Sequence, residues 1–451
     1  MSNLPGNSQA NTEEIGVAIV GCGTVGGAVA SILINQQDRL SRCIEVPIRL
    51  RAIVDVDFTH AEQLGLDENL FIDNVDAVLS RGDVQIVAEL IGGTDEAKEV
   101  VERALRAGKN VVTANKALLA HYGFELIKMA RENDVCISFE ASCAGAIPII
   151  SVLTEQLACD KIDAMYGIVN GTCNYILTAM SQQNHTYSEA LAIAQQRGMA
   201  EADPSLDVTG HDSAHKLAIL AALAFGQRID LEKIYVEGID NLHPQDIQYG
   251  KELGYVIKLL AVARRQGDAL SLRVHPAFIS TLHPLAWVSG PFNAISIYAE
   301  NAGHLMFYGR GAGVPATAAA VVGDIASIAL GNAQRKFDKL QLWPDQNEPA
   351  EQLDIGTIRC RYYVRLQVED RPGVFAQVAR ILGDRQISIS SLLQHESAPG
   401  RTDGVPVVIT TYDALEANVR AAIAEINQLE VTKAPCVCIR MVAEHPEKAS
   451  S

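Results

Sequence analysis

The sequence lacks the features that mark several special classes of protein. No apolar run approaches the roughly 20 residues that cross a bilayer. The opening stretch, MSNLPGNSQANT, has neither the basic start nor the apolar core of a signal peptide. The nine cysteines include no CxxC pair, which disfavours a disulfide framework or a zinc site. These absences favour a cytoplasmic protein without a membrane partner.

Positive charge is also scarce. The chain has 37 lysines and arginines against 54 acidic residues, a formal net charge of -17. Long-range repulsion would oppose binding to nucleic acid or to an anionic membrane surface. Neither is therefore expected as a partner. At 451 residues the chain is also too long for one compact core, so two or three domains are expected.

Residues 13–135 alternate between short apolar runs rich in β-branched residues and helical patterns. The runs predict strands at Ile15–Val20, Ile48–Val54, Ile86–Leu90 and Asn110–Thr113. Strands that alternate with helices predict a parallel sheet, an α/β domain of the Rossmann type.

The rest of the chain divides into two further blocks. Residues 136–335 mix helical and alternating patterns, which predicts an α+β domain, and a polar linker is expected within 336–358. Residues 359–443 give the order β-α-β-β-α-β, which is typical of a small ferredoxin-like domain. The chain is thus predicted to hold three domains of mixed α/β structure.

A glycine pattern, Gly21-x-Gly23-x-x-Gly26, directly follows the first strand and opens a helix. Gly21 would allow a tight turn, Gly23 would let the backbone approach a pyrophosphate, and Gly26 would let the helix pack on the strand. The helix N-terminus would offer N–H groups to the phosphates. The pattern predicts a dinucleotide site, although a glycine turn without a ligand has the same spacing.

Asp55 ends the second strand, where an acid would bind the ribose 2′-OH of NAD. No arginine follows it to hold a 2′-phosphate, and Asp57 adds negative charge. The sequence therefore favours NAD over NADP, while NADP and a plain turn acid both stay open.

The segment from Glu201 to Lys216 is rich in acids. Pro204 and Gly210 punctuate it, so residues 201–210 are predicted to be mostly loop. Asp212 and Lys216 then share one face of an otherwise apolar helix that must be buried. A lysine at the edge of such a helix, amid carboxylates, can give a proton to a newly reduced carbonyl oxygen. A surface ion pair has the same spacing and stays open.

Two further side chains are candidates. Lys116 follows the strand Asn110–Thr113, at the carboxyl edge of the sheet where ligands bind in such folds. A solvated lysine at a helix start is the alternative. Cys143 stands near a predicted helix start and could be an acylating nucleophile. A small buried residue in a tight turn is the alternative for Cys143.

The motifs taken together resemble the homoserine dehydrogenase family. Beyond the glycine pattern they are Thr113-Ala-Asn-Lys116-Ala-Leu, Glu140-Ala-x-x-Ala-Gly-x-Ile-Pro148, Asn170-Gly-Thr-x-Asn-Tyr175, Glu201-Ala-Asp-Pro-x-x-Asp207-Val-x-Gly-x-Asp212-x-x-x-Lys216, Pro284-Leu-Ala-x-Val288 and Gly309-Arg-Gly-Ala-Gly313. The acid–lysine segment is specific to the family, whereas the glycine pattern is not. Asp370-Arg-Pro-Gly373-Val-Phe resembles ACT domains, which bind small amino acids.

The resemblance implies an oxidoreductase that reversibly reduces L-aspartate 4-semialdehyde to L-homoserine with NAD(P)H, in threonine, methionine and isoleucine biosynthesis. It implies that Lys216 donates the proton, that Lys116 assists beside the nicotinamide, and that Asp207 holds the lysine network. Residues implied in substrate binding are Glu201, Asp212, Gly171 and Thr172.

The resemblance also implies where the cofactor and an ion bind. The cofactor contacts would be Gly21, Gly23, Thr24, Val25, Gly26, Asp55, Thr94, Lys116 and Gly313. A structural monovalent cation, usually sodium, would bind at Glu140 and the carbonyls of Cys143, Gly145 and Ile147. A helix at about 314–332 would complete the dinucleotide domain. The central domain would pair chains into a homodimer or homotetramer, and the ACT domain would bind an effector, for which threonine is the natural guess.

Two rival interpretations stay open. A semialdehyde dehydrogenase of another type would use Cys143, but Asn133–Ile150 holds no histidine or arginine to support it. A non-catalytic sensor of amino acids and dinucleotides would not need Lys216 and its acids. The sequence leaves cofactor preference, effector, ion and oligomeric state undecided. It predicts that deletion beyond about residue 355 spares catalysis and abolishes amino acid inhibition.

Overall fold

The computed structural model describes residues 14–395, 404–443 and 445. The chain divides into two compact units, Met1–Ala158 with Ala312–Asn347 and Cys159–Gly311 with Glu348–Ser451. This division differs from the predicted boundaries. Residues 136–158 group with the dinucleotide-type unit, and the C-terminal block groups with the central one.

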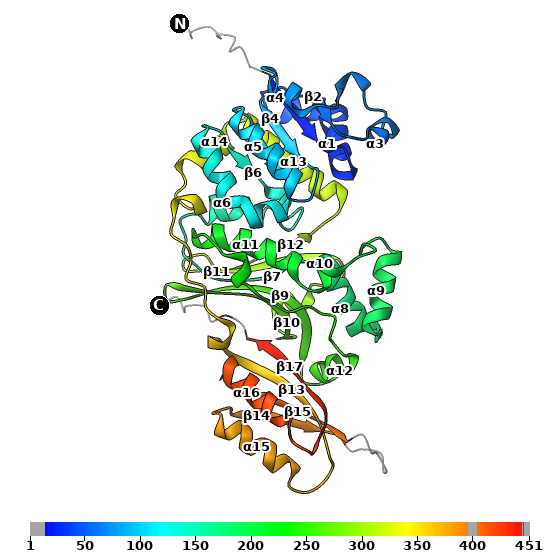
Figure 1. The fold of residues 1–451 in the computed structure, drawn as a ribbon, viewed down its shortest axis with the longest axis vertical. Coiled ribbons are helices and arrows are strands. Elements are labelled where there is room, and N and C mark those ends of the chain that lie inside the picture. The colour runs from blue at the N-terminus through cyan, green and yellow to red at the C-terminus, as the bar shows by residue number, and fades with distance from the viewer. Residues whose placement is uncertain (1–13, 396–403, 444, 446–451) are drawn as a thin grey trace, which may run out of the picture. The chain divides into compact units, whose positions relative to one another are not determined.

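The first unit is built on a six-stranded parallel sheet in the order β3-β2-β1-β4-β5-β6. Figure 1 shows strands of this sheet with helices beside them. Its strands are β1 (Ile15–Val20), β2 (Ile48–Val54), β3 (Phe71–Ile72), β4 (Ile86–Glu89), β5 (Asn110–Thr113) and β6 (Ile137–Ser138). The order runs outward in both directions from the neighbouring strands β1 and β4. This is the Rossmann-type topology, and ligands bind at the point where the order reverses.

The first unit also holds helices, several of which pack on the sheet. They are α1 (Thr24–Asn35), α2 (Gln37–Cys43), α3 (Thr59–Gln63), α4 (Val75–Leu79), α5 (Asp95–Arg106), α6 (Lys116–Glu132), α7 (Ile149–Ser151), α13 (Val314–Ala329) and α14 (Asn332–Lys339). The pair α1 and α13 pack together, as do α5 and α6. Because parallel crossovers are right-handed, reversal of strand order puts α1 and α5 on opposite faces. Helices on both faces explain why the central strands are mostly apolar.

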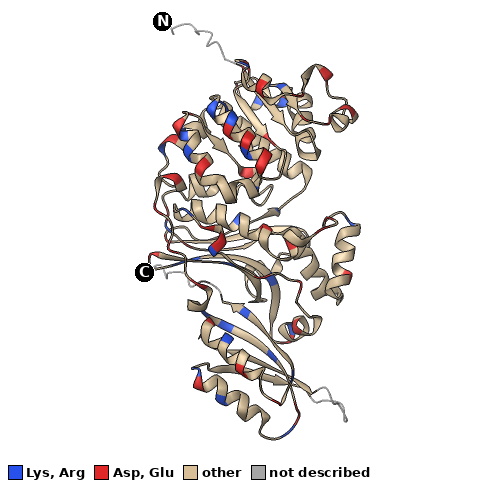
Figure 2. Ribbon diagram, viewed as in Figure 1, with Lys and Arg blue, Asp and Glu red and all other residues tan. Residues whose placement is uncertain are grey.

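Helix α5 carries charged residues of both signs on the outer surface of this unit. Acidic and basic residues are interspersed along it (Figure 2). Its ion pairs include Arg103 with Glu99 and Arg106 with Glu102, both spaced i, i+4. Such exposed pairs each contribute a few tenths of a kcal/mol. The buried side of the helix, not these pairs, therefore holds it to the sheet.

The second unit contains a single 11-stranded sheet whose main path is β12-β11-β7-β9-β10-β17-β13-β15-β14. The central strands are β7 (Ile162–Ile168), β8 (Tyr235–Val236), β9 (Tyr255–Gln266), β10 (Ala269–Ser280), β11 (Phe292–Ala299) and β12 (Gly303–Arg310). The helices of this part are α8 (Gly171–Gln183), α9 (Tyr187–Gln196), α10 (Ser205–Val208), α11 (His211–Phe225) and α12 (Pro244–Glu252). Both α8 and α11 pack on β9.

The C-terminal strands and helices form a ferredoxin-like domain. They are β13 (Arg359–Val368), α15 (Val374–Asp384), β14 (Ile389–Gln394), β15 (Val405–Thr411), β16 (Ala414–Leu415), α16 (Glu416–Ile426) and β17 (Thr432–Val442). The predicted order β-α-β-β-α-β is confirmed, with the short β16 added. The domain has its own apolar core, in which Tyr362, Val378 and Ile426 are buried.

This domain shares its sheet with the central one. β17 and β10 lie side by side (Figure 1). The two strands run parallel, with Ala277 opposite Arg440 and Ile279 opposite Val442. Sheet hydrogen bonds therefore connect the two parts directly. Residues 359–443, which the sequence predicts as a regulatory domain after a linker, therefore continue the sheet of the central part.

Candidate active site

The glycine loop after β1 has the geometry that its spacing predicts. Gly21 has φ +95°, and a Cβ there would lie 2.7 Å from the Leu90 backbone. A Cβ on Gly26 would lie 1.9 Å from the Gly21 carbonyl oxygen, so helix and turn touch. A Cβ on Gly23 would meet open space. Gly21 and Gly26 are therefore required by packing, whereas Gly23 leaves room for an approaching group.

Helix α1 begins directly behind this loop. Gly23 is its N-cap and Thr24 and Val25 are its first residues; no side chain of the described residues caps this end. The first amide groups of a helix have no partner within it. They suit the pyrophosphate of a dinucleotide, which is the group that the open space at Gly23 would admit.

Asp55 follows β2 beside the same loop. Its Oδ2 accepts a hydrogen bond from the Cys22 amide at 2.5 Å, and its Oδ1 accepts one from the Val56 amide at 2.7 Å. These bonds fix the carboxylate at the loop. A ribose hydroxyl would have to share oxygens that already accept main-chain bonds.

The remaining predicted cofactor residues all belong to the first unit. Thr94 is the N-cap of α5, Lys116 is the first residue of α6, and Gly313 is the N-cap of α13 with φ +113°. Asn115 joins two of these loops, because its amide donates to the Gly93 carbonyl at 2.6 Å and its Oδ1 caps α6. Thr94 and Lys116 thus follow neighbouring strands, β4 and β5, at the same edge of the sheet.

A buried polar cluster surrounds Lys216 in the second unit. The Lys216 ammonium donates to Asp212 Oδ2 and to the Val169 carbonyl, both at 2.7 Å. The Asn170 amide donates to Asp212 Oδ2 at 2.8 Å and to Asp207 Oδ1 at 2.7 Å. Lys216 is 8% exposed and Asp212 2%. The pair is therefore buried, and the alternative of a surface ion pair is excluded.

Asn170 uses both ends of its side-chain amide in hydrogen bonds. Its Oδ1 accepts from the Cys173 amide at 2.8 Å and so caps helix α8, while its Nδ2 bridges the two carboxylates. A charged buried group must be paired to avoid a large desolvation cost. The cap thus fixes an amide that holds Asp207 and Asp212 together beside the lysine.

The predicted substrate residues are only partly brought together. Gly171 and Thr172 open helix α8 next to Asn170, and the Thr172 hydroxyl donates to the Met199 carbonyl at 2.8 Å. Glu201 is exposed, and no hydrogen bond between described residues joins its carboxylate to the cluster; its carbonyl accepts from Gln195. The stretch 201–210 is less irregular than predicted, because Ser205–Val208 forms the short helix α10.

Comparisons with known proteins match this arrangement. Family models described as "Homoserine dehydrogenase, NAD binding domain", "Homoserine dehydrogenase" and "ACT domain" match residues 21–140, 148–326 and 362–431. A homoserine dehydrogenase of Neisseria gonorrhoeae is 39% identical over 96% of this chain and 99% of its own.

The chain belongs to the homoserine dehydrogenase family.

Solved structures agree with this assignment. The homoserine dehydrogenase of Thiobacillus denitrificans is 38% identical, with a TM-score of 0.89 over 95% of this chain and 98% of that one. A homoserine dehydrogenase described as hyperthermophilic, archaeal and in complex with NADPH is 28% identical, with a TM-score of 0.60 over 70% of this chain and 98% of its own. The predicted Rossmann-type, mixed and ACT parts are confirmed.

Sequence reasoning missed two residues of this homoserine dehydrogenase fold. Asn170 was part of a motif but had no assigned role; its signal is an asparagine immediately before a helix start. Glu89 is fully buried at the end of β4, where it accepts from the Thr113 hydroxyl at 2.6 Å and the Ile91 amide at 2.9 Å. Its signal is an acid within an apolar strand. Glu89 holds the loop that leads to Thr94.

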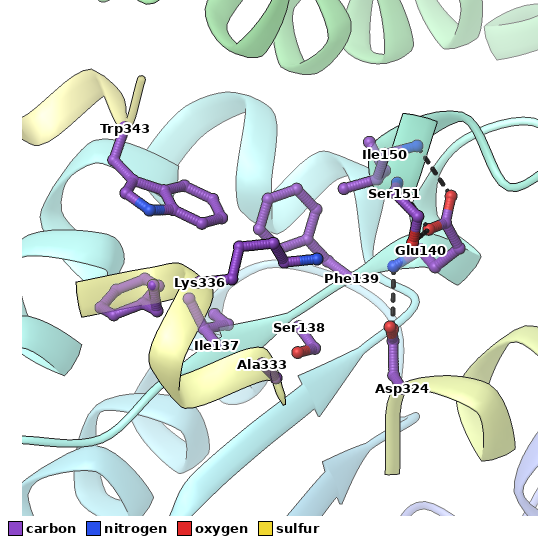
Figure 3. A pocket seen from close by; sticks show the side chains of 11 residues that line it. Ile137, Ser138, Phe139, Glu140, Ile150, Ser151, Asp324, Ala333, Lys336 and Trp343 are labelled. Carbon is purple, nitrogen blue, oxygen red and sulfur yellow. Dashed lines mark hydrogen bonds between the residues drawn. The ribbon is translucent and has the colours of Figure 1, made fainter. Parts of the chain in front are cut away.

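The turn from Glu140 to Ile147 is compact and buried. The Glu140 carboxylate accepts from the Ile150 amide and from the amide and hydroxyl of Ser151, and the Glu140 amide donates to Asp324 at 2.8 Å (Figure 3). These groups line a cavity of about 20 Å³, room for about one water. The described residues hold no cluster of three or more His, Cys, Asp or Glu side chains suited to a metal.

Cys143 lies inside this turn and is fully buried. A nucleophile must reach its substrate, and burial favours the alternative of a small packed side chain. Membership of the homoserine dehydrogenase family points the same way.

Across the described residues, no single helix is long and apolar enough to cross a membrane. Helix α13 together with the following segment Asn332–Gln346 reaches the length and composition of a membrane span, but the pair is bent by 78°.

Proposed function

We propose that the chain catalyses the reversible NAD(P)H-dependent reduction of L-aspartate 4-semialdehyde to L-homoserine. One observation carries the proposal: the buried cluster of Lys216, Asp212, Asn170 and Asp207 lies within residues 148–326, which the catalytic family model matches. A buried lysine held by a carboxylate is a suitable proton donor for the oxygen of an aldehyde that accepts a hydride.

The nicotinamide, when bound, supplies the hydride. The Lys216 ammonium gives its proton to the carbonyl oxygen as negative charge develops there. Asp212 and the Val169 carbonyl orient the ammonium through two hydrogen bonds of 2.7 Å. In the reverse direction the neutral amine would take the proton from the hydroxyl of homoserine. Lys116, at the start of α6, would assist close to the nicotinamide.

Charge and helix geometry suit the other end of the substrate. Asp207 and Asp212 place two carboxylates beside Lys216. Carboxylates attract the ammonium group of an amino acid. Gly171 and Thr172 open a 13-residue helix whose first amides suit the substrate carboxylate. Glu201 would join this site on substrate binding; its exposed position leaves it available.

The first unit would hold the cofactor through Gly21, Gly23, Thr24, Val25, Gly26, Asp55, Thr94, Lys116 and Gly313. The open space at Gly23 and the uncapped start of α1 support this assignment. We infer a modest preference for NAD, because the Asp55 carboxylate would repel a 2′-phosphate. The related archaeal enzyme is described in complex with NADPH, so both cofactors must be tested.

A monovalent cation, sodium by preference, would bind the Glu140 turn. The ligands would be Glu140 and the main-chain carbonyls of Cys143, Gly145 and Ile147. The Glu140 carboxylate already accepts from three donors, and the Ile147 carbonyl accepts from the Ile149 amide at 2.7 Å, so the ion would share these oxygens with those donors. Hard cations favour such oxygen ligands. Consecutive left-handed residues, Ala144 and Gly145, support the proposal because they turn the chain sharply within the loop.

We further propose three functional parts: residues 13–135 with about 314–332 for the cofactor, 136–335 for catalysis and dimerisation, and 359–443 for regulation, with 336–358 as a linker. The ACT part would bind an amino acid effector, threonine first. The chain would act in the cytoplasm as a homodimer or homotetramer. The ferredoxin-like fold and the matched ACT model support the regulatory assignment.

The test is NAD(P)H consumption with L-aspartate 4-semialdehyde. Lys216→Ala should lower kcat by roughly 10²- to 10⁴-fold, the usual loss for a general acid, while NADH still binds. Lys161→Ala, which changes an exposed lysine of the same unit, is the matched control. Parallel rates with NADH and NADPH, each with and without threonine, test the cofactor and effector. Unchanged turnover in Lys216→Ala would contradict the mechanism.

A further inference from the structure

A buried arginine of the ACT domain contacts the catalytic domain. Arg440, on β17, donates to both carboxylate oxygens of Glu416 at 2.5 and 3.0 Å. Its Nη1 donates to Glu237 Oε2 at 2.7 Å. Glu416 lies on α16 of the ACT domain, whereas Glu237 follows β8 of the catalytic domain. One guanidinium group thus connects the two parts.

The arginine is held in a single orientation. Its side chain is 7% exposed, and the guanidinium lies over the ring of Tyr235, 4.8 Å from the centroid. The Tyr235 hydroxyl donates to Glu237 Oε2 at 2.9 Å. On the other side, Glu416 also accepts from the Tyr362 hydroxyl at 2.7 Å and from Arg420 at 2.8 Å. Planar, multidentate contacts of this kind fix geometry as well as adding energy.

The chain beyond Glu237 packs on the acid segment of the active site. The Ile239 amide donates to the Val208 carbonyl at 2.8 Å. A Cβ on Gly238 would lie 2.3 Å from that same carbonyl oxygen, so the two backbones are in close contact. Val208 ends helix α10, immediately after Asp207.

The other end of this contact is the start of the catalytic helix. Gly210 has φ +91° and is the N-cap of α11, and a Cβ there would lie 3.1 Å from Val236 and 3.4 Å from the Glu237 carbonyl. Helix α11 carries Asp212 and Lys216. Displacement of the Glu237 segment would therefore move both Asp207 and the start of the helix that bears the proton donor.

We propose that Glu237 and Arg440 are positioning residues for the reaction, through which the ACT domain holds residues 207–212 in their catalytic geometry. The inference rests on the proposed function and extends it to residues outside the cluster. Neither side chain touches the reacting groups. Their effect passes through main-chain contacts at Gly238 and Ile239, which permit little displacement because both backbones are in van der Waals contact.

Glu237 is the residue to change. Its side chain is 39% exposed, so truncation removes one partly exposed carboxylate. Truncation of Arg440 would instead remove two hydrogen bonds from the buried Glu416 and leave it with Arg420 and Tyr362 alone, which would disturb the ACT domain itself. Glu237→Ala should lower kcat/KM for the semialdehyde by roughly 2- to 30-fold, the range for residues that couple through a network. The loss should appear with the semialdehyde, and the KM for NADH should not change. Glu237→Gln keeps an acceptor for Arg440 and Tyr235 and should recover part of the loss.

Hydrogen exchange supplies a readout independent of turnover. In Glu237→Ala the amides of residues 205–212 should exchange faster, while those of β9 and β11 should not change. Glu232→Ala, at an exposed glutamate five residues earlier in the chain, is the matched control and should leave both readouts unchanged.

The outcomes separate this proposal from the proposed function. If the wild-type protein does not turn over the semialdehyde, the proposed function fails, and local exchange at residues 205–212 still judges the contact. If the wild type is active but Glu237→Ala keeps both its kcat/KM and its exchange at 205–212, the positioning role is overturned. Faster exchange throughout the second unit would also overturn it, because Glu237 would then serve general stability.

Discussion

Replacing Asp324 by asparagine should make the stability of the first unit less dependent on pH. Asp324 lies on α13 and lines the cavity beside the Glu140 turn (Figure 3). Burial raises the pKa of its carboxyl from 3.8 to about 7; the amide of Glu140 opposes this, and the carboxylate of Glu140 adds to it. The native state therefore binds a proton that the unfolded chain releases near pH 4.

The sign and size of the effect follow from this pKa difference. Between pH 4 and 7 the native state holds more protons than the unfolded state, so its stability falls as pH rises. Each pH unit within that interval changes the free energy of unfolding by about 1.4 kcal/mol. From pH 5 to pH 8 the wild type should lose about 2.5 kcal/mol through this group. Asp324→Asn keeps an acceptor for the Glu140 amide and has no charge to bury.

Tryptophan fluorescence gives the assay. Of the two tryptophans, Trp343 is buried and lines the same cavity, whereas Trp287 is 79% exposed. In a Trp287→Phe background, urea unfolding followed by Trp343 reports on the first unit. We compare the free energy of unfolding of the Asp324→Asn variant with that of its parent at each pH. The variant's value minus the parent's should rise by about 2.5 kcal/mol from pH 5 to pH 8. Asp338→Asn, at an exposed acid on the next helix, should show a constant difference. A constant difference for Asp324→Asn as well would refute the reasoning.

Two predictions concern the second unit. Burial lowers the pKa of Lys258 to about 8, and its amine donates to Asn174 and to the Val288 carbonyl. Between pH 8 and 10.5 the unfolded chain holds a proton that the native state has released, so native stability rises with pH. Chemical unfolding should show the free energy of unfolding of the wild type, relative to Lys258→Met, rising by about 2 kcal/mol from pH 7 to 9.5. No rise would mean that Lys258 stays charged in the native state. Deletion of the residues after 355 removes the strand β17 that pairs with β10, and with it the Arg440 that binds Glu237. The value of kcat/KM should therefore fall at least as far as in Glu237→Ala. A deletion variant with full activity would contradict the coupling.

The first unit was the easiest part to predict, and the reason is physical. A parallel sheet covered on both faces needs strands that are mostly apolar, and turns between them need glycine or polar residues. Both signals are local, so β1, β2, β4 and β5 were predicted within about one residue. β9 was missed because its run of apolar residues also fits a buried helix.

The active site was predicted where it depends on local spacing. Asp212 and Lys216 are four residues apart on one helix, so their contact follows from helix geometry. Asn170 is separated by 42 residues from Asp212, and nothing in its neighbourhood indicates which carboxylates its amide will meet. The pairing of β10 with β17 is likewise a matter of register between distant strands, which a single sequence does not encode locally.

Residues 207–208, next to the catalytic lysine's helix, are held by two contacts that come from different parts of the second unit. Asn170 fixes Asp207 from the start of α8, directly after β7 of the catalytic sheet. The Glu237 segment fixes Val208 from β8, whose position depends on β10 and, through Arg440, on the ACT domain. A ligand that shifts the ACT strands can therefore disturb the second support while the first stays in place. Inhibition through this route would act on proton delivery and substrate binding before it altered the cofactor site, since no residue of the glycine loop belongs to the second unit.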